Sequence, residues 1–275
     1  MNIRIVKTVA LKDLKEVRQN RFAWLPAIIV PLVFVVLFPL VGIVLPSSTG
    51  MPMDNLFADN SPLTLMMRNV PALTDLFAGM NEQQIWIIFF TGMLVAPFFL
   101  IMPLMFASIV GADSFAGEKE RKTLEALIYT PATDGELFVG KVIASVVPAV
   151  ALAWLSFAVY TLILNVVGWP IMGRIWFPLP PWWPLMLWVT PAIAVMSMAF
   201  TVLISSRVAT FMEAYQTSAA LVLLVMGLVA GQITGVLYLS VEVSLLIGLV
   251  FWIADVVLIR LAVRSFSRSN LLSRL

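Results

Sequence analysis

The sequence predicts an all-α polytopic membrane protein with six transmembrane helices, a surface helix before them and a charged helix between spans two and three. Hydrophobic residues make up 61% of the chain and charged residues 12%, whereas soluble domains average about 45–50% and about 25%. Mean hydropathy is +1.01. Several uncharged windows are long enough to cross a hydrocarbon layer about 30 Å thick. We therefore treat residues 1–275 as one transmembrane domain.

Six apolar runs predict the spans. They cover residues 24–46, 85–110, 142–168, 182–206, 217–239 and 243–260. The first run follows a long charged stretch, so no cleaved signal peptide is expected. The first outer loop, residues 47–84, contains short apolar clusters that predict small helices on the outer leaflet, and it is too short for a core of its own.

The basic residues predict the orientation. Of 17 lysines and arginines, only Arg68 and Arg174 fall in predicted outer loops. The other 15 fall in the N-terminal segment, in residues 111–141 and 207–216, or at the C-terminus. The positive-inside rule therefore places both termini and the 111–141 loop in the cytoplasm, and the expected location is the inner membrane.

Four tryptophans surround the outer connection between spans three and four, at Trp169, Trp176, Trp182 and Trp183. Tryptophan is enriched at membrane interfaces, which predicts an interfacial belt. An aromatic gate for substrate is the alternative.

Composition excludes several kinds of chemistry. The chain has no Cys and no His, so zinc, haem and iron–sulfur sites lack their usual ligands. Nucleophilic cysteine and histidine acid–base catalysis are excluded for the same reason. We expect no metal and no cofactor bound by this chain. The net charge of +2 reflects membrane topology and does not indicate nucleic-acid binding.

Residues 2–22 predict an amphipathic basic helix. Apolar residues recur at spacings of three and four, at Ile3, Val6, Ala10, Leu14 and Val17. Basic residues occupy much of the remaining surface, which is typical of a helix lying in the membrane interface. It is interpreted either as an anchor or as an elbow helix that also contacts a cytoplasmic partner.

The segment "GEKERKTLEALIYTP", residues 117–131, is the densest charged stretch. As part of a helix over 114–129, it would pair Glu118 with Lys122 and Arg121 with Glu125, each four residues apart. Pro131 ends this helix. Such order exceeds what an ordinary positive-inside loop requires, so we interpret the segment as a docking element for a partner protein.

A second helix is expected directly after the break. Thr133 and Glu136 have the spacing of a capping box, which predicts that the helix of span three starts about two turns inside the cytoplasm and runs through Lys141.

The run "FAGEKERKTLEALIYTPATDGELFVGKVIA" resembles the loop after span two in permeases of the type-2 ATP-binding cassette exporter family. The residues that carry the resemblance are Glu118, Glu120, Arg121, Thr123, Leu124, Glu125, Pro131, Glu136, Gly140 and Lys141. That family often has glycine before the threonine, where this chain has Lys122.

The resemblance implies a permease that pairs with itself or with a homologous permease and docks on a separate ATPase. Docking is expected through Glu118, Glu120, Arg121, Thr123, Leu124, Glu125 and Leu127. ATP and magnesium would be held by the partner, and this sequence has no Gly-x-x-x-x-Gly-Lys-Ser/Thr phosphate loop of its own. The implied activity is export, and the apolar spans favour a hydrophobic or amphipathic substrate.

Three glycines predict close helix packing in span five. Gly227, Gly231 and Gly235 form two overlapping Gly-x-x-x-Gly repeats, which let another helix approach closely. The motif fits either packing within the subunit or a dimer contact.

A few polar residues in the spans are candidates for a transport pathway: Ser197, Thr201, Gln232 and Asp255. Hydroxyl groups also bond back to their own helix. An ionisable residue in a span is a functional candidate, but Asp255 is also near enough to Arg260 for a structural pair.

Two other functions are alternatives. An ion-coupled secondary transporter often has internal repeats and intramembrane charges, and this chain shows no clear repeat and few such charges. An intramembrane enzyme is disfavoured by the absence of histidine, cysteine and clustered carboxylates.

Overall fold

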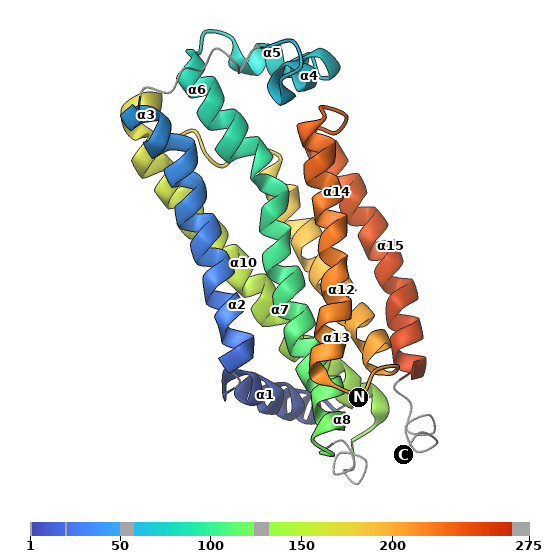
Figure 1. Cartoon of the computed structure of the whole chain (residues 1–275). Helices are drawn as coiled ribbons and strands as arrows, with labels where there is room; N and C mark the ends of the chain where they lie inside the picture. Colours follow the sequence, from blue (N-terminus) through green and yellow to red (C-terminus); the bar gives the residue numbers. More distant parts are fainter. Residues whose placement is uncertain (1, 20, 50–57, 124–131, 266–275) are drawn as a thin grey trace.

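The computed structural model describes residues 2–19, 21–49, 58–123 and 132–265, and all its regular elements are helices (Figure 1). None of these residues is in a strand, so the predicted all-α class is confirmed.

Six helices of the described residues are long and apolar enough to cross a membrane. They run over Ile28–Ser48, Glu82–Glu120, Asp134–Met172, Trp182–Ser205, Phe211–Ile233 and Val241–Arg264. Each overlaps one predicted span. Spans two and three extend past the predicted inner limits, because both helices continue beyond the apolar run.

Most spans consist of several helical segments. Span one contains α2 (Arg21–Leu32), η1 (Val33–Leu37), η2 (Leu40–Val44) and α3 (Leu45–Thr49). Span two contains α6 (Glu82–Ile87), η4 (Ile88–Leu94), η5 (Ala96–Leu100), α7 (Ile101–Ala112), η6 (Asp113–Gly117) and α8 (Glu118–Glu120). Span three is α10 (Asp134–Met172), and span four contains α11 (Trp182–Pro184), η7 (Leu185–Val189) and α12 (Thr190–Ser205). Span five contains α13 (Phe211–Ser218), η8 (Ala219–Leu221) and α14 (Val222–Ile233), and span six is α15 (Val241–Ser265).

The helix α1 (Ile3–Gln19) lies across one end of this bundle (Figure 1), where it packs mainly on α10 and contacts α8 through Lys12 and Glu118. We call this the charged end. A helix forms within the predicted residues 2–22, and its role as an amphipathic helix lying at a membrane surface remains a prediction.

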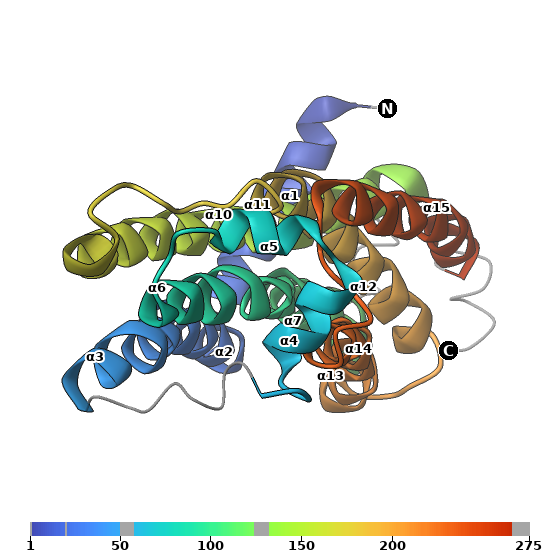
Figure 2. The ribbon, with the colours of Figure 1, turned by 90° about the horizontal axis from the view of Figure 1, so that it is seen from above.

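Spans two and four form the core of the bundle. In their apolar windows 78% and 61% of residues are buried, against 17% to 33% in the other four spans. Seen from above, span two lies between α2 on one side and α10 on the other (Figure 2). A shift of span two would therefore disturb contacts with several other spans.

Span two changes helical type inside the apolar region, at the join between η4 and η5. Pro97 has no amide hydrogen, so the carbonyl of Met93 four residues earlier lacks its usual donor. Side chains from three other spans bond to the carbonyls at this break. Tyr160 donates to Thr91 at 2.9 Å, Trp182 to Gly92 at 2.6 Å and Gln232 to Met93 at 3.3 Å.

Trp182 is a core residue and does not belong to an interfacial belt. Its side chain is fully buried and contacts the rings of Phe99, Phe157 and Phe177. Trp169 and Trp183 are about half exposed, as residues of a belt would be. The indole of Trp182 lies in the core because its N–H donates a hydrogen bond to the carbonyl of Gly92 in span two.

The first outer loop contains two short helices, α4 (Pro62–Asn69) and α5 (Ala72–Phe77), lying over the bundle (Figure 2). Ser61 caps α4 by accepting a hydrogen bond from the amide of Thr64. Leu63, Met66 and Leu73 are buried in the main core. Two small helices form as expected and their buried apolar side chains pack on protein, and their placement at the outer leaflet remains a prediction.

Candidate functional site

The inner end of span two differs from the predicted separate helix over residues 114–129. The helix of span two continues to Glu120, and the chain then turns at Arg121 and Lys122. The amide of Thr123 bonds back to the carbonyl of Glu118 at 2.9 Å, which ends the helix. Leu124, Glu125 and Leu127 lie outside the described residues.

Lys122 has φ 56°, in the left-handed region where side chains are disfavoured. Glycine adopts this conformation without the steric cost of a Cβ atom. The family that the loop resembles often has glycine at this place, and the observed backbone gives the physical reason. With Lys122 in place of glycine, the chain makes this turn at the cost of a strained backbone conformation at Lys122.

Of the two predicted ion pairs, the structure tests only that of Glu118 with Lys122, because Glu125, the predicted partner of Arg121, lies outside the described residues. Glu118 pairs with Lys12 at 2.7 Å and with Lys141 at 2.8 Å, and does not pair with Lys122. Arg121 pairs with Asp113 at 2.9 Å, one helical segment back in span two. Glu118 and Lys122 do not pair because the chain leaves the helix at Lys122, which removes the regular helical spacing on which that predicted pair depended.

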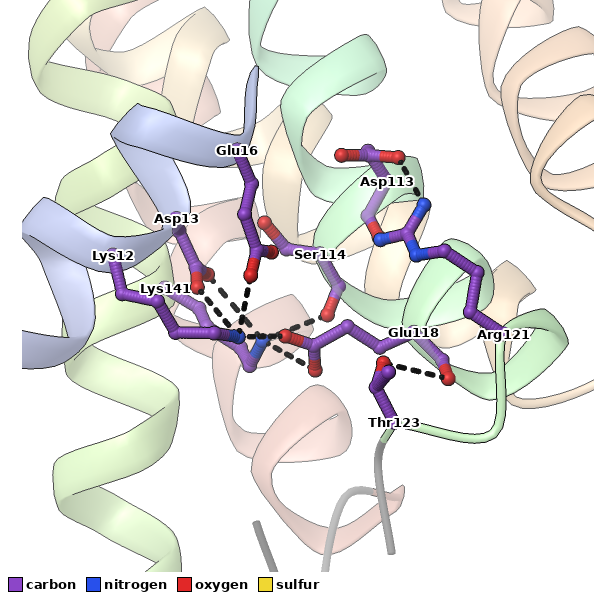
Figure 3. A network of polar contacts seen from close by, with 9 residues as sticks. All are labelled: Lys12, Asp13, Glu16, Asp113, Ser114, Glu118, Arg121, Thr123 and Lys141. Atoms are coloured by element: carbon purple, nitrogen blue, oxygen red, sulfur yellow. Dashed lines mark hydrogen bonds and ion pairs between the residues drawn. The ribbon is translucent and has the colours of Figure 1, made fainter. Parts of the chain in front are cut away.

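The residues Lys12, Asp13, Glu16, Glu118 and Lys141 form one ionic cluster (Figure 3). Lys141 is fully buried and pairs with Asp13 at 3.3 Å as well as with Glu118. Its ammonium group also donates to the carbonyl of Ser114 at 2.8 Å. Two of the carboxylates, Asp13 and Glu118, are also buried, so the cluster joins α1, the end of span two and the start of span three.

Lys12 occupies the position where the three carboxylates converge. Asp13, Glu16 and Glu118 lie within 4.8 Å of one another, which resembles a cation site. The ammonium of Lys12 contacts all three, at 3.6, 3.3 and 2.7 Å. Burial lowers the pKa of Lys12, but the hydrogen bond and charge of Glu118 outweigh it and raise that pKa. The ammonium supplies the positive charge that a metal ion would otherwise bring.

The start of α10 holds α1 by three contacts. The capping box of Thr133 and Glu136 is formed as predicted, and the second oxygen of Glu136 accepts the amide of Asn2 at 2.6 Å. At Gly140, an added Cβ atom would lie 2.8 Å from the side chain of Val9. Gly140 is therefore required for the close approach of α1, and Lys141 adds the ionic contact.

The end of span two also contacts the connection between spans four and five. Lys119 donates to the carbonyl of Val208 at 3.1 Å, and Glu120 accepts the amide of Phe211 at 2.8 Å. Asp113 raises the pKa of Arg121 by hydrogen bonding and charge, against the lowering effect of burial. Of the predicted docking residues that are described, Glu118 faces inward, and Glu120, Arg121 and Thr123 make contacts within the chain.

Asp13 is the participant that the sequence analysis missed. It lies three residues after Ala10 and four before Val17, so it falls on the apolar side of the helix. A carboxylate at such a position signals a buried partner. Its partner Lys141 is the last of the residues that carry the resemblance to the exporter family, and nothing in that run indicates a pair with Asp13.

The predicted pathway residues of span four make hydrogen bonds within the chain, and their role in a pathway remains a prediction. Ser197 and Ser108 are both fully buried, and their hydroxyl groups lie 2.6 Å apart between α12 and α7. Thr201 bonds back to the carbonyl of Ser197 at 2.8 Å. The bond between Ser197 and Ser108 joins spans two and four, and the bond of Thr201 stays within α12.

The three glycines of span five have separate roles. Gly235 lies beyond α14 with φ +69°, and an added Cβ would meet Leu65, so the second repeat is not a helix face. Gly231 lies against Leu237. Gly227 faces open space, with nothing within 4 Å of an added Cβ atom. Of these three glycines, Gly227 is the one that faces open space within the described chain, and the contact it makes remains a prediction.

Asp255 does not form the alternative pair with Arg260. Its side chain is 1% exposed, and neither carboxyl oxygen has a hydrogen-bond partner among the described residues. Arg260 is exposed on another face of α15. Gln232 is likewise buried, and of its amide atoms only the nitrogen bonds within the described chain.

The site thus links α1, the end of span two, the start of span three and the connection between spans four and five at the charged end of a six-span bundle. The profile of the ABC-2 family transporter proteins matches residues 7–272, which include all six spans and the charged loop. A search of curated proteins found no match. The chain therefore belongs to the ABC-2 family of transporter proteins.

Proposed function

We propose that this chain is the membrane-spanning permease of an ATP-driven exporter, and that a separate ATPase subunit docks on the loop over residues 121–133. The family match supports a permease. The ionic cluster supports the docking place, because Glu118 and Lys141 join the two ends of that loop directly. A force applied to the loop would reach α1 and spans two and three together.

The proposed docking surface is narrower than the predicted set of residues. Glu118 is fully buried, so its role is to fix the base of the loop. The ATPase contacts are assigned to the part of the loop that carries Leu124, Glu125 and Leu127, with apolar side chains for a cleft and a charge that sets orientation. The partner holds ATP and magnesium.

The charged end is proposed to face the cytoplasm, with both termini on that side of the inner membrane. Support comes from the excess of basic residues there.

A second permease subunit, a copy of this chain in the simplest case, is proposed to contact the open face of α14 at Gly227. The proposed substrate is hydrophobic or amphipathic, in keeping with apolar spans, and the family match favours this function over an ion-coupled transporter.

The test is copurification of the tagged chain from native membranes in mild detergent, with mass spectrometry of its partners. We expect a stoichiometric subunit bearing a phosphate loop, and ATP hydrolysis that requires this chain. Glu125→Ala and Leu127→Ala should each reduce ATPase recovery by about tenfold, the effect of losing roughly 1.4 kcal/mol of binding. Glu82→Ala, at the opposite end of the bundle, is the matched control. Equal recovery with all three variants would place the docking surface elsewhere.

The subunit pairing has its own test. Gly227→Leu should reduce dimer cross-linking in membranes, because a leucine there prevents close approach of a second α14. Leu249→Phe, a bulky change on the exposed face of α15, is the control. Unchanged cross-linking in Gly227→Leu would exclude this face as the contact.

A further inference from the structure

Asp255 lies well inside the membrane-spanning part of α15. At about 1.5 Å per residue, it is roughly 21 Å along the axis from Val241 and roughly 15 Å from Ser265. The exposed Arg260 lies about 7.5 Å further along the helix, so burial against protein, and not depth alone, separates the carboxyl group from water. The side chain is only 1% exposed and faces the protein.

The segments packed against this face carry no charge. α15 packs mainly on α12 and η7, with a smaller contact to α11, and none of the three contains Asp, Glu, Lys or Arg. On α15 itself, Glu242, Arg260 and Arg264 are all exposed. Arg260 is about 140° around the helix from Asp255. No charged group of the described residues thus faces Asp255 from its own helix or from these three segments.

Neither oxygen of Asp255 has a hydrogen-bond partner in the described part of the chain. An ionised carboxylate in a low-dielectric setting without a partner is costly, and such a group takes up a proton instead. We propose that Asp255 is a proton-binding site within the membrane, and that proton binding favours the contact of α15 with α12. In that step a carboxylate oxygen forms an O–H bond with a proton taken from water, and the reverse step returns the proton to water.

A proton fits this site better than a metal ion. Hard metal ions need about six oxygen ligands, and the group of three acidic side chains in the described chain is Asp13, Glu16 and Glu118, at the charged end. The nearest buried polar side chain on the same face of α15 is Ser244, roughly 16 Å along the helix. A proton requires one oxygen, which Asp255 supplies.

The coupling to helix contact follows from linkage. The ionised form is stabilised by water, and water reaches Asp255 only when α15 separates from α12. Proton release therefore favours separation, and separation favours release by the same factor. This proposal does not depend on an ATPase partner, and its test uses neither ATP nor a partner subunit.

The first test is infrared difference spectroscopy of the full chain in lipid nanodiscs at pH 5.5, where an exposed aspartate is still ionised. We expect a carbonyl stretching band of a protonated carboxyl group that is lost in Asp255→Asn and kept in Asp75→Asn, a change in the outer helix α5. The proposal would be overturned if the wild-type chain showed no such band, or if the band were unchanged in Asp255→Asn. If Asp255→Asn does not fold, Asp255→Glu replaces it, and a shift of the band then identifies the residue.

The second test measures the helix contact. The chain has no cysteine, so Arg207→Cys and Val263→Cys place one spin label at the inner end of span four and one at that of span six. Raising the pH should lengthen the distance between labels in the wild-type background and leave it unchanged with Asp255→Asn. An identical response in both backgrounds would overturn the coupling.

Discussion

The Lys141 ammonium and the Glu118 carboxylate lie 2.8 Å apart in the interior of the protein, at opposite ends of the loop that joins spans two and three. Isolated buried pairs are weak evidence for stability, because desolvation offsets attraction. Here the pair is part of a cluster with Asp13 and Lys12, so each carboxylate contacts two ammonium groups. The arrangement specifies which three segments meet at the base of the loop.

Removing Lys141 should be strongly destabilising. Lys141→Met leaves Asp13 and Glu118 buried with only Lys12 to balance them, and breaking a buried pair costs about 3–5 kcal/mol. Unfolding of the purified chain in detergent measures the loss. Lys15→Met, on the exposed face of α1, should change stability by less than about 0.5 kcal/mol. Comparable losses for the two variants would show that the cluster adds nothing.

Alanine at two glycines of α10 should have opposite effects. Gly140→Ala places a methyl group against Val9, and overpacking costs about 1–3 kcal/mol. Gly135→Ala meets nothing within 4 Å and should stabilise by up to about 1 kcal/mol through helix propensity. Thermal unfolding gives the sign of each change, and limited trypsin cleavage after Lys12 or Lys15 reports whether α1 is released. Destabilisation by both changes would point to another cause.

Lys122→Gly should stabilise the fold. The left-handed conformation costs a non-glycine residue roughly 1–2 kcal/mol, and glycine removes this cost. The same replacement at Lys15, inside helix α1, should destabilise by about 1 kcal/mol. Melting temperatures of the two variants against wild type make the comparison. A loss of stability in Lys122→Gly would contradict the assigned turn.

The side-chain hydrogen bonds to the carbonyls at the break in span two can be tested at Gln232. Gln232→Leu removes the donor to Met93, and interhelical bonds in bilayers average about 0.6 kcal/mol with values up to about 1.7. We expect a loss in that range by unfolding in lipid–detergent mixtures. Gln216→Leu, at an exposed position of α13, is the control. No loss beyond the control would mean that the Met93 carbonyl is satisfied in another way.

The ionic contact of Lys12 should persist to high pH. Its pKa is raised in the folded protein, so its contribution to stability is fully present below its unfolded pKa of about 10.4 and is lost only as pH rises through the higher folded value. The difference in melting temperature between wild type and Lys12→Met should therefore be the same at pH 6.5 and pH 8.5. A difference that shrinks over this range would contradict the direction of the shift.

The sequence by itself determined the helical class, the six spans, the capping box at Thr133 and the charged loop. These depend on hydrophobic run length, on cap spacing and on charge distribution, all of which are local along the chain. Pro97 likewise marks the break in span two.

Tertiary structure alone decided the partners of the polar groups. Glu118 pairs with Lys12 and Lys141 because α1 folds across the base of spans two and three, and no spacing along the sequence specifies that crossing. Ser197 faces Ser108, and Gln232 reaches Met93, for the same reason. In a low-dielectric interior each buried polar group needs a partner, but which partner it finds depends on how whole helices pack. Asp255, which packing leaves without a partner in the described chain, is for that reason the residue whose chemistry we propose to test.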